Sequence, residues 1–195
     1  MRLLFRSFPE HVESCLNVEP RLGSLVVFLA GAFGFIYAIE KTKNSAAGVP
    51  VLLGFTFFMG LMLSRMIAMV LGFKNGSELI MTAFGGTAGV FFVMASLSSV
   101  IKRDLSGMGK WLFIGAIGIL IGGIINVFVG SPIGMAVLSV MAIIVFSGFL
   151  LYDLKRIIDG GETNYISATL GLYLSLFNIF QSLLALLGIF GGERD

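Results

Sequence analysis

The residue of this chain best placed to do chemistry is Asp153, the first charge after a long apolar run. Lys155 and Arg156 lie two and three residues after it. On one interpretation, Asp153 is a proton-responsive carboxylate at the cytoplasmic mouth of a pore, since ionisable groups at the edge of a bilayer are often functional. On the other, it is a helix-end residue that nearby Lys or Arg side chains neutralise at the headgroups. No second carboxylate is within reach in the sequence, which favours the second interpretation.

Arg65 lies inside an apolar segment, about six residues, or ~9 Å of helix rise, from its end. A buried guanidinium needs a carboxylate or carbonyl partner and would mark a functional site. Glu78, at the start of the next apolar segment on the same side, is the natural partner for an intramembrane charge pair. The alternative is that Arg65 snorkels to the outer interface at small cost, and this is the slightly favoured interpretation.

Three amides also lie inside apolar segments: Asn126, Asn178 and Gln181. They could line a pore and hydrate or coordinate a passing cation. More often such amides hold helices together, at about 1 kcal/mol each, and we favour that role.

Catalytic motifs are absent from these segments. The sequence has no HExxH, GxSxG or P-loop, and no Ser/Lys or paired-Asp arrangement inside an apolar run. Its single Cys15 excludes an internal disulfide and Cys-rich metal sites, and its only histidine, His11, lies in the polar N-terminal segment. We therefore expect a non-enzymatic protein with no cofactor, no bound metal and no nucleic-acid partner.

The elements that must position these residues are membrane-spanning helices. The 195 residues are 57% hydrophobic and only 12% charged, against about one-quarter charged in soluble domains. About 20 apolar residues span a bilayer as helix. This rule predicts an all-α, polytopic membrane bundle in one domain, residues 22–190, followed by a short tail, 191–195. Its six predicted spans are Leu22–Ile39, Val49–Leu71, Leu79–Ile101, Trp111–Val129, Gly134–Tyr152 and Tyr165–Phe190.

The last span carries a stripe of small or polar residues on one helical face. Small residues let helix backbones approach closely, and polar ones find partners on neighbouring helices. We therefore predict that this span lies at the centre of the bundle, at the end of a charged hinge, 153–164. The stripe consists of Asn164, Ser167, Gly171, Ser175, Asn178, Ser182 and Ala185.

The basic residues predict the orientation. Those on the first, third and fifth loops are Lys41, Lys43, Lys102, Arg103, Lys110, Lys155 and Arg156; the remaining loops and the C-terminal tail hold only Lys74 and Arg194. Seven against two places the odd loops in the cytoplasm of a bacterial-type inner membrane and the C-terminus in the periplasm.

The polar segment 1–21 fits this orientation poorly. Six spans leave it outside, although it carries Arg2, Arg6 and Arg21. Either the tail is tolerated there, or one further helix precedes residue 22, and the charge asymmetry favours the further helix. We then expect ~20 more apolar residues to be encoded upstream of Met1, and part of segment 1–21 to be a gene-start artefact.

Several sequence blocks resemble the Bax inhibitor-1 family, and more narrowly its bacterial YccA-like branch. The longest is GGETNYISATLGLYLSLFNIFQSLLALLG, residues 160–188. A second is AFGGTAGVFF, residues 83–92, and the loops KRDLSGMG and LLYDLKRII are also similar. The resemblance runs from about Leu25 to Phe190. It implies seven helices with the last at the centre, so that the helix lacking here is the family's first.

The resemblance implies two classes of function. Members like YccA bind and restrain the membrane-anchored ATP-dependent metalloprotease of membrane quality control. Other members are proposed to leak calcium under pH control through two aspartates. Asp153 matches the first aspartate, but Ser175 stands at the second position. The incomplete pair favours the protease modulator over the calcium or cation leak, with the lipid bilayer as the surroundings in either case.

Overall fold

The computed structural model of the chain describes residues 20–192, apart from the side chains of residues 20–22, 24 and 25. All secondary structure in the described part is helical, which confirms the all-α class. The predictions for segment 1–21 and for the tail 193–195 lie outside the described residues, except that the backbone of residues 20 and 21 begins the first helix described.

Within residues 20–192, six helices follow one another with short connections. Each predicted span lies almost wholly within one of them, and the helices extend past the apolar runs by up to six residues. Their bounds are α2 Pro20–Thr42, α3 Gly48–Leu71, α4 Gly76–Val100, α5 Met108–Val129, α6 Pro132–Ile158 and α7 Tyr165–Gly191.

Among the described residues, α3 to α7 are five helices long and apolar enough to cross a membrane. The protein is therefore a polytopic membrane protein. The predicted span Leu22–Ile39 lies within α2, a helix of 23 residues. Because several side chains near the start of α2 are not described, its crossing of the membrane stays a prediction.

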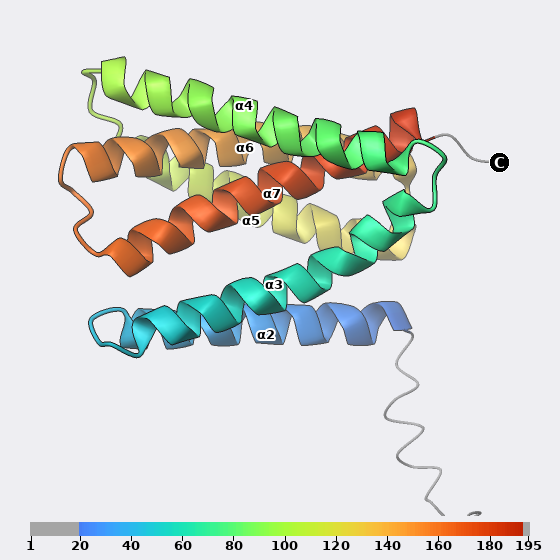
Figure 1. Cartoon of the computed structure of the whole chain (residues 1–195), viewed down its shortest axis with the longest axis horizontal. Coiled ribbons are helices and arrows are strands. Elements are labelled where there is room, and N and C mark those ends of the chain that lie inside the picture. The colour runs from blue at the N-terminus through green and yellow to red at the C-terminus, as the bar shows by residue number, and fades with distance from the viewer. Residues whose placement is uncertain (1–19, 193–195) are drawn as a thin grey trace, which may run out of the picture.

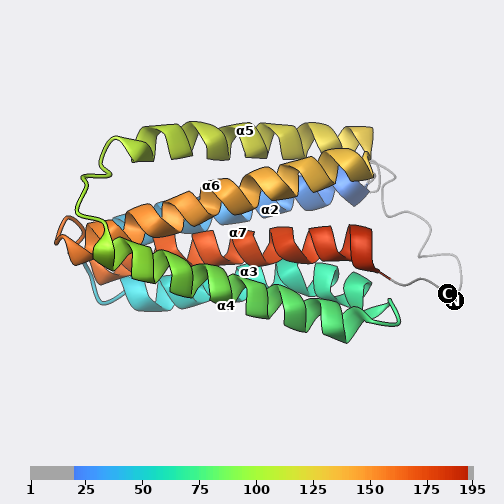
Figure 2. The ribbon, with the colours of Figure 1, turned by 90° about the horizontal axis from the view of Figure 1, so that it is seen from above.

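The last helix, α7, runs through the middle of the bundle, as predicted. It contacts α2 and α3 on one side and α4 and α6 on the other (Figure 1). By contrast, α5 lies on the outside and packs chiefly against α6 (Figure 2).

Two clusters of buried side chains join α7 to its neighbours, one toward each end of the bundle. The first cluster combines α2, α3 and α7 through Ile39, Phe55, Met59 and Ile166. The second combines α3, α4 and α7 through Val70, Leu79, Ala83 and Leu184. The first cluster uses Ile166 from the start of α7 and the second uses Leu184 from nearer its end. This helix therefore holds the layers together along most of its length.

The ends of α6 show how the connections are built. At its start, the Ser131 hydroxyl accepts a hydrogen bond from Gly134 N at 3.1 Å, and Pro132 occupies the first turn, where a proline is tolerated. At its end, Gly160 has φ +74°, a left-handed conformation that glycine adopts at little cost. The predicted hinge 153–164 is therefore wrong at its start. The helix continues to Ile158 and the connection is residues 159–164, because charge marks the edge of the membrane and not the end of the helix.

Candidate functional site

Asp153 lies on the last turns of α6 and faces α7, which passes unusually close. Gly171 of α7 makes this approach possible, since a Cβ added there would lie 2.8 Å from Asp153 Oδ2. The half-buried carboxylate therefore occupies the space that a side chain at position 171 would take. The positive charge of Arg156 attracts the carboxylate, and the negative charge of Glu162 repels it.

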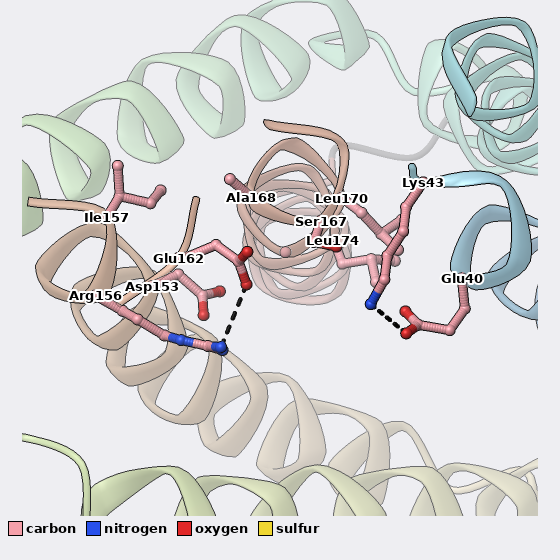
Figure 3. A pocket seen from close by; sticks show the side chains of 11 residues that line it. Glu40, Lys43, Asp153, Arg156, Ile157, Glu162, Ser167, Ala168, Leu170 and Leu174 are labelled. Carbon is pink, nitrogen blue, oxygen red and sulfur yellow. Dashed lines mark hydrogen bonds and ion pairs between the residues drawn. The ribbon is translucent and has the colours of Figure 1, made fainter. Parts of the chain in front are cut away.

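A cavity of about 370 Å³ surrounds this carboxylate at the end of the bundle formed by the loops richest in Lys and Arg, which we call the basic end. The helices α2, α6 and α7 line it together with the α2–α3 turn and the α6–α7 connection (Figure 3). Its charged and polar lining residues are Glu40, Lys43, Asp153, Arg156, Glu162 and Ser167, and its remaining lining residues are Ile157, Ala168, Leu170, Gly171 and Leu174.

Two ion pairs organise the charges of the cavity. Lys43 pairs with Glu40 at the end of α2, and Arg156 pairs with Glu162 at 3.3 Å across the α6–α7 connection (Figure 3). Both pairs leave Asp153 as the carboxylate without an ion-pair partner among the lining residues. The cavity thus contains one carboxylate without an ion-pair partner among its lining residues, between two ion pairs.

The connection beside the cavity is held in place by its own hydrogen bonds. Gly161 N and Glu162 N both donate to Arg156 O, at 2.9 and 3.2 Å. The Asn164 side chain caps α7 by accepting from Ile166 N and Ser167 N, each at 3.0 Å. Asparagine is one of the residues preferred at this position, because its side-chain oxygen satisfies backbone N–H groups that have no partner within the helix.

Asn164 also joins the two connections of the basic end. Its Nδ2 donates to Lys43 O at 3.0 Å and to Asn44 Oδ1 at 2.8 Å. One side chain therefore fixes the start of α7 against the turn between α2 and α3. We call these contacts the Asn164 clamp.

The other predicted residues of α7 continue inward from the cavity. Ser175 lies one turn beyond Gly171 on the same face and is 2% exposed. The amide of Asn178 donates to Leu174 O at 2.8 Å, within its own helix. Gln181 is half-buried near the middle of α7. Whether these residues line a pore stays a prediction.

Asn126 lies at the opposite end of the bundle. A Cβ added at Gly134 of α6 would lie 2.6 Å from Asn126 Oδ1, so the amide packs at the α5–α6 contact. Gly134 and Asp153 are about 28 Å apart along α6. The structure does not bring Asn126 to the Asp153 cavity.

Arg65 and Glu78 both lie toward that opposite end, and both are exposed. Arg65 is on α3, and Glu78 is in the first turn of α4. The charge pair between them stays a prediction.

Among the residues of the cavity, sequence reasoning singled out only Asp153 as a candidate. Lys43 was used for orientation only, Ser167 and Gly171 were interpreted as general packing positions, and Glu40 at the end of α2 was not considered. The spacing of Asp153 and Gly171 carries no signal by itself, because their closeness depends on how α6 and α7 cross.

A bundle of long apolar helices packed around a central helix places the chain among the polytopic membrane proteins. The chain belongs to the Bax inhibitor-1 family. Residues 4–192 match the family described as "Inhibitor of apoptosis-promoting Bax1".

Three relatives are similar over most of their length. An uncharacterized membrane protein of Vibrio cholerae is 39% identical over 97% of this chain and 84% of its own. The "Modulator of FtsH protease YccA" of Escherichia coli K12 is 38% identical over 88% of this chain and 77% of its own. An uncharacterized protein of Pseudomonas aeruginosa is 34% identical over 87% of this chain and 77% of its own.

Proposed function

We propose that this chain is a non-enzymatic inner-membrane protein that binds and restrains the membrane-anchored ATP-dependent protease FtsH. The observation that carries the proposal is the 38% identity to the Escherichia coli modulator of FtsH over 171 residues. A second Escherichia coli relative, equally similar, is named an inner membrane protein. The similarity covers 88% of this chain, so it extends well beyond any single helix or loop.

Restraint of a membrane protease by a helical protein requires contact within the bilayer or at its surface. The α5 helix offers such a surface, because it packs chiefly against α6 and none of its residues is buried. A Cβ added at Gly118 on this helix would have no atom within 4 Å. A large substitution there therefore changes the surface without disturbing the fold.

The test is reconstitution of the full chain with FtsH in liposomes. We expect co-purification of the two proteins and slower degradation of a membrane substrate. Gly118→Trp should weaken both effects. Gly85→Trp is the matched control, since Gly85 is equally open on α4. Unchanged degradation at a several-fold excess of the wild-type chain would contradict the proposal.

The second candidate is a pH-sensitive calcium or cation leak. The observation that favours it is the unmatched Asp153 carboxylate in a charged cavity at the basic end. Against it, the residue one turn inward on the facing surface of α7 is Ser175 and not a second carboxylate.

Cation flux into proteoliposomes across about pH 6 to 8 tests this candidate, because a titrating carboxylate would make flux depend on pH. Asp153→Asn should flatten the pH response, and Ser175→Asp should increase flux. The control is Asp159→Asn, because Asp159 is exposed and already paired with Lys155 at 2.7 Å. A wild-type chain without flux at any pH would eliminate the leak.

A further inference from the structure

A second, wholly different cavity lies away from the basic end, between α3, α4 and α7. It has a volume of about 580 Å³, within the range of about 300–1,000 Å³ common for small-molecule sites. In Figure 1, α3 and α4 meet at the turn that joins them and diverge toward their other ends, with α7 between them. The cavity lies in this wedge. Its lining residues are Leu63, Ile67, Phe84, Thr87, Ala88, Phe91, Phe92, Tyr173, Leu176, Phe177 and Phe180.

The cavity borders both buried clusters near the middle of the bundle. Tyr173 and Phe177 also pack against the first buried cluster, and Ile67 and Phe180 pack against the second. The same side chains therefore face the core on one side and unfilled apolar space on the other. Atoms that face such a space lose dispersion contacts that a close-packed interior would supply, so an apolar occupant stabilises the fold.

The lining offers an occupant almost no polar partner. The hydroxyl of Thr87 donates to Ala83 O of its own helix at 2.8 Å. Tyr173 carries the other hydroxyl of the lining, and the remaining side chains are aliphatic or aromatic. The exposed rings of Phe84 and Phe92 flank the opening on α4. A ligand here is recognised by its hydrocarbon and not by a polar or charged group.

The shape of the lining distinguishes a hydrocarbon chain from a helix. Helices associate closely in a bilayer where small residues face each other, whereas this cavity is walled largely by bulky side chains. A helix with its side chains is also about 10–12 Å across, far wider than a hydrocarbon chain. A single acyl chain is narrow and flexible enough to enter.

The depth of the cavity identifies the source of the chain. Its α4 residues, 84 to 92, lie roughly 12 to 24 Å along the helix from Gly76, which is the middle of a membrane span. At this depth the bilayer supplies phospholipid acyl chains. We propose that the wedge between α3, α4 and α7 binds one acyl chain of a bilayer phospholipid, which fills the apolar space beside the two buried clusters.

The test uses the full chain in vesicles containing a phospholipid with a photoactivatable group midway along one acyl chain. Mass spectrometry of the labelled peptides then locates the contact. We expect α7 residues 173–180 and α4 residues 84–92 to be labelled well above the exposed face of α5, and an excess of unlabelled phospholipid to reduce this labelling.

Filling the cavity sharpens the test. Ala88→Phe should lower labelling of residues 173–180 about tenfold, the change that corresponds to about 1.4 kcal/mol of binding. Ala68→Phe is the control, because Ala68 is exposed on α3 and does not line the cavity. If Ala88→Phe does not fold, Ala88→Leu makes the same comparison with a smaller side chain.

Three outcomes would overturn the proposal. The first is labelling of α7 that Ala88→Phe and Ala88→Leu leave unchanged. The second is labelling of α5 as strong as that of the wedge. The third is a cross-link in the wedge to a second copy of this chain or to another protein in place of lipid.

Discussion

Two helices of this bundle, α5 and α7, are both apolar over more than twenty residues, yet the fold uses them in opposite ways. The more apolar of the two, α5, has no buried residue, whereas α7 buries Ile166, Ser175, Ile179 and Leu184. Lipid tails are as apolar as leucine, so hydrophobicity alone does not draw a helix inward in a bilayer. Close packing does, and this makes the positions of small and polar residues more informative than total hydrophobicity.

Both helices carry small residues, and the difference lies in how many neighbours meet them. On α5, Gly115 and Gly122 face Val145 and Leu138, which both belong to α6. On α7, Gly171 faces Asp153 of α6, while Gly188 approaches Val70 of α3. The central helix is therefore packed from several sides and the peripheral helix from one.

The largest expected difference comes from deleting a leucine side chain on each helix. Leu184→Ala on α7 removes a fully buried side chain and should destabilise the protein by about 2–4 kcal/mol, because it leaves a cavity. Leu120→Ala on α5, where the leucine is 40% exposed, should change stability by about 0.5 kcal/mol or less. Reversible unfolding in mixed micelles measures both. Equal losses would remove the distinction between the two helices.

Adding a side chain should give the next largest difference. Gly171→Leu places atoms where the Asp153 carboxylate lies and should cost about 1–3 kcal/mol through overpacking. Gly118→Leu on α5 meets open space and should be nearly neutral. Thermal unfolding of the two variants in one detergent makes the comparison. A stable Gly171→Leu protein would show that α6 and α7 are free to separate.

Removing the Asn164 clamp should give a smaller difference in stability between the starts of the two helices. Asn164→Ala removes the α7 cap and the contacts to the α2–α3 turn, and should cost about 1–2 kcal/mol. Asn44→Ala is the control, because it removes one of these hydrogen bonds and leaves the cap intact. Gly107, which precedes α5, has no side-chain cap to lose. If both variants lose equal stability in the same unfolding assay, the cap contributes nothing.

The smallest expected effect is on the connection before α5. Asp104 accepts hydrogen bonds from Ser106 N at 2.8 Å and from Ser106 Oγ at 2.9 Å, and these lower the pKa of Asp104 below its usual value of 3.8. Because the folded pKa is the lower one, the stabilisation is present above about pH 4 and is lost as pH falls through the folded pKa.

An NMR titration of the Asp104 carboxyl in micelles measures this shift. The midpoint should lie below 3.8 in the wild-type chain. Ser106→Ala should raise it part of the way back, since the backbone donor remains. A midpoint that the substitution leaves unchanged would show that the Ser106 hydroxyl is not a donor to Asp104.

The helices and the central position of α7 were predictable because both depend on local patterns. Apolar length predicts a span, and a small-residue stripe predicts a helix packed on more than one side. The start of the α6–α7 connection was not predictable in this way. Asp153 ends the apolar run but not the helix, and the turn is set by Gly160 with its positive φ.

The cavities could not be predicted, since each depends on which helices become neighbours. The Asp153 cavity needs the end of α2 beside α6 and α7, which brings Glu40 and Lys43 to it. The wedge depends on the divergence of α3 and α4, which no residue pattern encodes. For Asn126 the sequence left open a pore-lining role and a role in holding helices together, with the second favoured, and the structure places it against Gly134 at the contact of α5 and α6.

The central place of α7 also affects how the protein is made, because α7 is synthesised after the helices it joins. Ribosomes add about 5–20 residues per second, so the 27 residues of α7 emerge over roughly 1–5 s once α6 is complete. During that interval both buried clusters lack their α7 members, Ile166 and Leu184. A chain interrupted before residue 165 therefore holds every earlier helix but lacks the one that joins them, and we expect the cell to clear it rather than store it.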